Sequence, residues 1–288
     1  NKLEKVLAAG HLAVTSECGP PRGSDHEKIT KKGQLIKDHV DAINITDNQT
    51  SVTRLCSLAA CIRLKLMGLE PVLQMVVRDR NRIALQSDIL GAASYDIHNI
   101  LCLSGDHQQF GDNPQGQNVF DIDSMQLIQT VRMMRDEGKF LGGDDIDRPP
   151  QMFVGAAANP FADPFEYRVI RLAKKIDAGA DFIQTQCVYN LDRFKEWMRM
   201  AREEGLMVGM SSGAAMVVAA EVAGFGDMNP DYLNNYIWLI NNINGSGGAV
   251  EAVTLDAVRH GLSLVEGGVI SPADLAEQVN RVLVDLPE

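Results

Sequence analysis

Several features are missing from this 288-residue sequence, and each absence excludes a class of protein. No apolar run approaches the roughly 20 residues that a membrane-spanning helix needs. No basic segment followed by an apolar one stands at the start, so we expect no secretory signal peptide. Positive charge is scarce, because 27 Lys and Arg face 38 Asp and Glu, for a net charge of −11. We therefore expect no nucleic-acid or membrane partner, since both favour basic patches.

Cysteine is also sparse, and its spacing is uninformative. The five cysteines are scattered and form no C-x-x-C pair. A disulfide framework, a zinc site and an iron–sulfur site all require closer or paired spacing, so we expect no metal site in this chain. Such cysteine usage fits a reducing compartment, and the sequence predicts a cytoplasmic protein.

The sequence does contain a regular alternation of short apolar runs and helical patterns. The apolar runs predict strands at 12–14, 41–46, 71–77, 99–105, 151–158, 181–186, 206–210 and 236–243. Apolar residues at helical spacing predict helices at 26–39, 51–67, 82–95, 123–137, 162–178, 191–204 and 271–283. Strands that alternate with helices are typical of a parallel sheet with helical crossovers.

Two parallel architectures fit this alternation, a doubly wound open sheet and a closed eight-stranded barrel. The G-x-G-x-x-G fingerprint of the dinucleotide-binding open sheet does not follow the first strand. The chain length suits a barrel. We therefore predict one (β/α)8 TIM barrel domain over residues 1–288, with the weakest patterns in 206–288.

Polar residues gather where the predicted strands end, and a barrel would bring them together at one mouth. They are Glu17, Thr46, Gln74, Asp106, Asn159 and Gln186. Glu17 is followed by Cys18-Gly19-Pro20-Pro21, in which the prolines fix φ and remove backbone donors. We expect this turn to hold the Glu17 carboxyl group rigidly at the end of the first strand.

These motifs resemble those of the methylenetetrahydrofolate reductase family, a group of flavin-dependent (β/α)8 barrels. The resemblance covers roughly residues 3–205. The matching pieces are S-E-C-G-P-P at 16–21, I-N-I-T at 43–46, L-C-L-S-G-D at 101–106 and K-K-I-D-A-G-A-D-F-I-Q-T-Q at 174–186. G-A-A-A-N-P-F-A-D-P at 155–164 is similar to the form in acetogenic bacteria.

The resemblance implies hydride transfer from reduced FAD to 5,10-methylenetetrahydrofolate, which gives 5-methyltetrahydrofolate. Opening the folate's five-membered ring requires a proton on the departing nitrogen, and Glu17 matches the family's general acid. Asp106 matches an aspartate beside the flavin and the pterin, where its charge would make the flavin harder to reduce and stabilise a cationic intermediate. Gln186 matches a glutamine that hydrogen-bonds the folate.

The resemblance also implies a set of FAD contacts. Thr46, Asn48 and Gln74 are expected on the flavin side. Arg78, Lys174 and Lys175 are expected along the ribityl–diphosphate arm, where fixed positive charge suits phosphate. The electron donor is NADH, NADPH or a partner protein. Acetogenic relatives pair with an iron–sulfur subunit, so we expect an oligomer or a complex.

The sequence departs from the family at several positions, and these departures keep alternatives open. Cys18-Gly19 replaces an aromatic pair, and Gln74 stands where the enteric enzymes have histidine. Residues 201–215 are locally similar to the cysteine synthase family. The alternatives are a pterin-binding methyltransferase barrel without flavin and an accessory barrel subunit of a larger redox complex.

Overall fold

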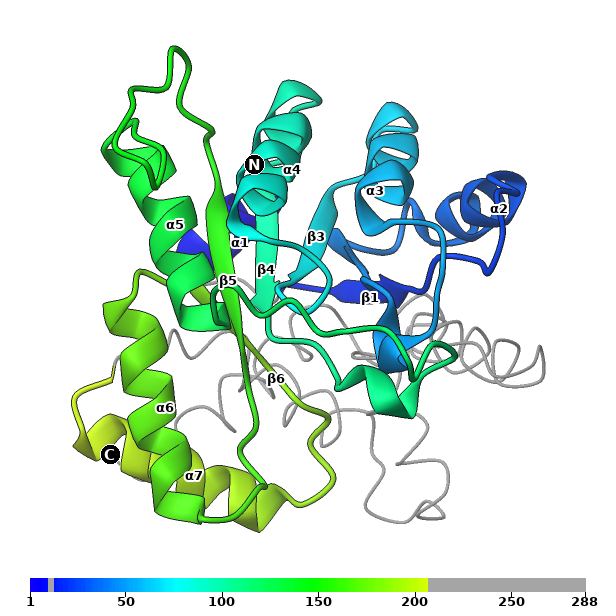
Figure 1. The fold of residues 1–288 in the computed structure, drawn as a ribbon. Coiled ribbons are helices and arrows are strands. Elements are labelled where there is room, and N and C mark those ends of the chain that lie inside the picture. Colours follow the sequence, from blue (N-terminus) through cyan, green and yellow to red (C-terminus); the bar gives the residue numbers. More distant parts are fainter. Residues whose placement is uncertain (10–12, 207–288) are drawn as a thin grey trace, which may run out of the picture.

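The computed structural model describes residues 1–9 and 13–206, and this part of the chain forms a curled parallel sheet with helices packed outside it (Figure 1). All adjacent strands pair in parallel, and their spatial order follows the sequence. The strands are β1 (Thr15–Cys18), β2 (Ala42–Ile45), β3 (Pro71–Val76), β4 (Asn99–Leu103), β5 (Phe153–Ala158) and β6 (Phe182–Thr185).

Helices connect these strands and cover the outer face of the sheet. They are α1 (Lys2–Ala8), α2 (Glu27–Ile36), α3 (Ser57–Leu66), α4 (Arg82–Ser94), α5 (Ser124–Asp136), α6 (Phe165–Asp177) and α7 (Leu191–Glu203), with two short 3₁₀ turns, η1 (Gln49–Ser51) and η2 (Gln108–Phe110). None of the helices in the described part is long and apolar enough to cross a membrane.

The strand order decides between the two predicted architectures for these six strands. A doubly wound sheet reverses its order at a switch point, whereas the strands of a barrel follow one another. The observed order β1 to β6 has no reversal and is the order of a barrel. The predicted seventh and eighth strands and the helix at 271–283 lie outside the described residues, apart from Leu206, so closure into eight strands stays a prediction.

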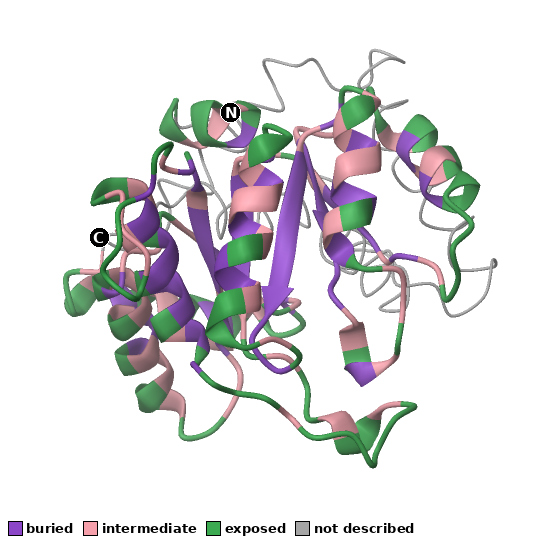
Figure 2. Cartoon of the chain, turned by 45° about the horizontal axis from the view of Figure 1, so that its top comes forward, coloured by how far each residue is buried: buried purple, intermediate pink, exposed green. Residues whose placement is uncertain are grey.

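Side chains alternate along each strand between an outer and an inner layer. The outer layer, which includes Ile43, Ile45 and Cys102, packs against the helices in the large hydrophobic core. The inner layer is a smaller apolar cluster of Leu3, Ala42, Val72 and Leu101, flanked by Phe153 and Phe182. Figure 2 shows the result, with buried strands behind helices that bury one side and expose the other. Leu3 belongs to α1, which therefore closes the amino end of the interior.

Two predicted boundaries were wrong. The first strand is Thr15–Cys18 and not 12–14, so Glu17 lies within the strand and not after it. The helix expected from residue 51 begins at Ser57. Asn48, Thr50 and Ser51 adopt positive φ values of 43°, 55° and 58°, which end any helical path there. Contacts from distant loops hold this segment, and local periodicity does not report such contacts.

Gly155 on β5 has no room for a side chain. A Cβ atom there would lie 2.2 Å from the ring of Phe182 on the neighbouring strand β6. The Phe182 ring instead stacks on Phe153 at a centroid distance of 5.0 Å. Because Gly155 has no side chain, the rings of Phe153 and Phe182 can fill the interior at the amino ends of β5 and β6.

Candidate active site

A polar layer lies above the apolar bottom of the interior, on three adjacent strands. Glu17 pairs in register with Asn44, and Gln74 lies two residues beyond the inward-facing Val72. The three side chains are almost completely buried, with exposed fractions of 7%, 5% and 6%. The layer holds one carboxyl group and two amides.

Burial dominates the electrostatics of Glu17. Removal from water raises the pKa of its carboxyl group to about 8, against a weaker opposing effect of a hydrogen bond from Gln74. Glu17 Oε1 and Asn44 Oδ1 have no hydrogen-bonding partner in the described part of the chain. Buried polar atoms are normally paired, so unpaired atoms in a polar layer indicate space for a ligand group. At neutral pH Glu17 is mostly a neutral acid that can donate a proton.

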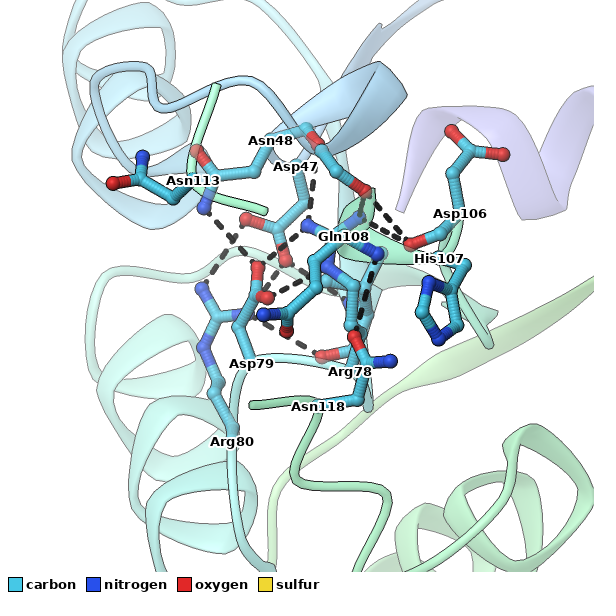
Figure 3. A network of polar contacts seen from close by, with 12 residues as sticks. Asp47, Asn48, Arg78, Asp79, Arg80, Asp106, His107, Gln108, Asn113 and Asn118 are labelled. Carbon is cyan, nitrogen blue, oxygen red and sulfur yellow. Dashed lines mark hydrogen bonds and ion pairs between the residues drawn. The ribbon is translucent and has the colours of Figure 1, made fainter. Parts of the chain in front are cut away.

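Outside this layer, Arg78 organises the rim at the carboxyl end of the strands (Figure 3). Its guanidinium group is 2% exposed and donates to both carboxylate oxygens of Asp79, each at 2.7 Å. The remaining donors reach Ser51 Oγ at 2.7 Å, the Asp106 carbonyl at 2.9 Å and the Asn48 carbonyl at 3.2 Å. All five donors of Arg78 are thus used within the protein.

The pKa of Asp79, which pairs with Arg78, shows how strongly the charged groups of the rim interact. Burial alone would raise the pKa of Asp79, but the hydrogen bonds and charge of Arg78 outweigh burial and hold this pKa below its usual value. Next to it, Asp47 accepts from Arg80 at 2.6 Å and from the Val76 amide at 3.0 Å. These pairs fasten the β2–α3 loop to the exit of β3, and they explain why the loop keeps positive φ values.

Asp106 lies in the same network, at the start of the long loop after β4. Its carboxylate accepts from the Thr50 amide at 3.0 Å and is otherwise exposed. Further along this loop, Asp112 accepts from Arg22 at 2.8 Å and from the Thr53 amide at 3.1 Å. Gly111 packs so closely on the β2–α3 loop that an added Cβ would lie 1.8 Å from the Ser51 carbonyl oxygen. The loops after β1, β2 and β4 therefore form one connected rim.

A separate cavity of about 240 Å³ lies where β4, β5 and α6 meet. Three cations line it, Arg168, Arg171 and Lys175, together with Gln186. The Lys175 ammonium group donates to the Ala157 carbonyl, and burial, followed by the like charge of Arg171, lowers the pKa of Lys175. Among the described residues, Arg171 has no hydrogen-bonding or ion-pair partner. A cavity with unneutralised positive charge suits an anion.

The structure thus distributes the predicted site residues over three neighbouring places. Glu17 and Gln74 are in the interior layer, and Asn48, Arg78 and Asp106 are in the rim. Gln186 and Lys175 line the cavity, whereas Lys174 is exposed on α6. Thr46 is buried at the end of β2 and donates to the Gln49 side chain.

Sequence reasoning overlooked Asn44, Arg168 and Arg171. The signal for Asn44 was present, because residues 42, 44 and 46 of a strand face one side. The arginines of α6 were detectable only as part of a helix pattern, in which charged residues usually face solvent.

Comparisons with known proteins show which family the chain resembles. A family model described as methylenetetrahydrofolate reductase matches residues 2–222. A probable methylenetetrahydrofolate reductase (NADPH) of Caenorhabditis elegans is 25% identical over 234 residues, covering 76% of this chain and 33% of that protein. A methylenetetrahydrofolate reductase (NADH) of Arabidopsis thaliana is 23% identical over 217 residues, covering 72% and 35%. The chain therefore spans about a third of the length of these curated relatives.

Among solved structures, an uncharacterized protein from Clostridium thermocellum that binds two copies of 5-methyl-5,6,7,8-tetrahydrofolic acid is similar at a TM-score of 0.48. It is 14% identical, and the match covers 97% of each chain.

Proposed function

Because this chain belongs to the methylenetetrahydrofolate reductase family, we propose that it reduces 5,10-methylenetetrahydrofolate to 5-methyltetrahydrofolate in an FAD-dependent reaction, with Glu17 as general acid. The observation that carries this proposal is the interior polar layer. It offers one carboxyl group, neutral at physiological pH and with a buried unpaired oxygen, flanked by amides.

Glu17 supplies what the ring opening needs. The bond between the bridging carbon and the departing nitrogen breaks readily only when that nitrogen receives a proton. A carboxyl group with a pKa of about 8 retains its proton near neutral pH, yet it is acidic enough to transfer it in the reaction. An exposed glutamate would be ionised at this pH and would have no proton to give.

FAD fits the described residues at two places. The cation cluster of Arg168, Arg171 and Lys175 matches a diphosphate group in charge, and we place the diphosphate arm in that cavity. Lys174 contributes positive charge from the exposed side of α6. Asp106, Thr46, Asn48 and Gln74 are placed on the flavin side. Arg78 was expected along the diphosphate arm, but all five of its donors are used within the protein, so we propose that it supports the β2–α3 loop instead. When bound, FAD supplies the hydride.

Gln186 and Glu17 are proposed to contact the folate. Gln186 directly follows β6 and lines the cavity, and its amide can both donate to and accept from a pterin ring. Asp106 adds a carboxylate at the rim, and its charge disfavours electron addition to a neighbouring flavin. Asp106→Asn is therefore expected to raise the reduction potential of bound flavin.

The decisive experiment is a visible absorbance spectrum of the purified protein, before and after anaerobic addition of 5-methyltetrahydrofolate. Flavin bands that bleach on addition establish the cofactor and the reverse half-reaction. Glu17→Gln should retain the bands but lose bleaching by a factor of roughly 10² to 10⁴ in rate, while an artificial reductant still bleaches them. Asp25→Asn, an exposed site on the β1–α2 loop, is the control.

Two outcomes would contradict the proposal. Protein that shows no flavin band after incubation with FAD would favour a pterin-binding methyltransferase or an accessory subunit. Near-normal bleaching by Glu17→Gln would refute the role of Glu17 as acid. The electron donor, NADH, NADPH or an iron–sulfur partner subunit, is then identified by which of them bleaches the bands.

A further inference from the structure

Glu17 and Asn44 each leave a buried oxygen without a partner, and they are neighbours across two strands. Residue 17 of β1 pairs in register with residue 44 of β2. Cys18, Ile43 and Ile45 belong to the outer core, so the alternation of the strands turns Glu17 and Asn44 inward. Glu17 Oε1 and Asn44 Oδ1 are two of the buried side-chain atoms that have no hydrogen-bonding partner among the described residues, and they are the two on paired, inward-facing positions of β1 and β2. Both are acceptors when the carboxyl group is ionised.

One proton would satisfy both atoms. An ionised carboxylate can only accept hydrogen bonds, whereas a neutral carboxyl group also donates one. Paired strands lie about 4.8 Å apart, which is within reach of a Glu and an Asn side chain that point the same way. We propose that Asn44 is a positioning residue, whose side-chain carbonyl accepts the O–H of neutral Glu17 and holds this proton on the inner face of the sheet until it is transferred.

This inference rests on the proposed role of Glu17 as general acid, and it gives the two amides of the layer opposite tasks. The Asn44 carbonyl stabilises the protonated form of Glu17, and the Gln74 amide donates to the carboxyl group and stabilises the ionised form. In the reaction the O–H bond of Glu17 breaks, an N–H bond forms on the departing nitrogen and the electron pair stays on the carboxylate. Gln74 then holds this carboxylate until it is reprotonated.

The titration of Glu17 can be interpreted because its described neighbours are uncharged. Facing it from β2 and β3 are the uncharged side chains Asn44 and Gln74, and no charged side chain of the described residues contributes to its pKa. Cys18 and Cys61, the nearby titratable groups, belong to the outer core on the other side of the sheet. A change in the titration of Glu17 can therefore be assigned to the amide that was replaced.

The experiment measures the pKa of Glu17 directly, by ¹³C NMR of protein labelled at the glutamate carboxyl carbon, with Glu17→Gln to identify the signal. It is done without folate or flavin. Asn44→Leu, which removes the acceptor, should lower this pKa by about one pH unit. Asn44→Asp keeps an acceptor of the same shape and should raise it, because two carboxyl groups then share one proton. Gln74→Met is the matched control in the same layer and should also raise it.

The outcomes separate a positioning role from simple packing. If Asn44 only fills space, Asn44→Leu makes the surroundings of Glu17 less polar and raises its pKa, as Gln74→Met does. That result would overturn the inference. An unchanged pKa in Asn44→Leu overturns it as well. Because the titration uses no substrate, it gives the same answer whether or not the protein reduces folate, so its failure is distinct from a failure of the proposed function.

Discussion

The interior layer and the rim lie at the same end of the sheet, but they treat charge in opposite ways. In the rim, each buried charge has a partner, as in the pairs of Arg78 with Asp79 and of Arg80 with Asp47. In the interior, Glu17 has no counter-charge among the described residues and keeps one oxygen unpaired. Paired charges fix a loop in one conformation, whereas an isolated acid in an apolar setting has its pKa moved towards neutrality. Arg78 and Arg80 thus fix the loops of the rim, whereas Glu17 is the residue for which we propose a role in the reaction.

The largest expected effect tests the isolated acid. The folded protein holds a proton on Glu17 up to about pH 8, while the unfolded chain loses it near the ordinary value of 4.5. The stability that this proton gives is complete below the lower value and is lost as the pH rises through the upper one. Glu17→Gln cannot titrate, so relative to the wild type it should gain up to about 5 kcal/mol between these limits.

This gain is measured as the difference in thermal unfolding temperature between the two proteins across that pH range. Glu4→Gln, at an exposed position of α1, is the control and should follow the wild type. Parallel pH profiles for the wild type and Glu17→Gln would mean that Glu17 is not an isolated acid, and the contrast with the rim would disappear.

The next effect tests the paired rim. Arg78→Met leaves the Asp79 carboxylate without its bidentate partner and Ser51 Oγ without its donor, and it removes one of the two hydrogen bonds that each of the Asn48 and Asp106 carbonyls accepts. We expect a loss of about 3 kcal/mol in unfolding free energy, measured by urea denaturation. Arg82→Met breaks an ion pair with Asp121 that is exposed, at 52% for the arginine, and should cost much less than Arg78→Met because water screens the pair. Equal losses would show that burial does not distinguish the two pairs.

A smaller effect concerns the contact between two rim loops. Gly111→Ala would place a methyl group 1.8 Å from the Ser51 carbonyl oxygen, so one loop must move. The expected cost is about 1–3 kcal/mol, with faster proteolysis of residues 107–118. Gly23→Ala is the control, since no atom lies within 4 Å of its added Cβ. Unchanged proteolysis would show that the loops adjust independently.

The smallest effect is expected for the Arg22–Asp112 ion pair, which joins the loops after β1 and β4. Arg22 is 61% exposed, so water screens the pair. Arg22→Ala should lower stability by less than about 1 kcal/mol, and added salt should remove the difference. A loss of several kcal/mol in unfolding free energy that salt does not change would show that this pair behaves like a buried ion pair.

The sequence allowed prediction of the strand order and of the residues at the strand ends, because alternation and polar termini are local signals. It did not predict the start of α3, since Arg78 and Asp106, far along the chain, hold residues 48–51 out of a helix. It identified Glu17 but not Asn44, although both face the same interior. Register between strands is a tertiary property, so the neighbour of Glu17 became visible only in the structure.

The close fit of Gly155 against Phe182 has an evolutionary consequence. A larger residue at position 155 can be accommodated only if position 182 becomes smaller or moves, so the two positions cannot vary independently. In an alignment of relatives they should change together, a small residue in one strand accompanying a ring in the next. A larger residue at position 155 is therefore expected only in relatives that carry a smaller residue at position 182.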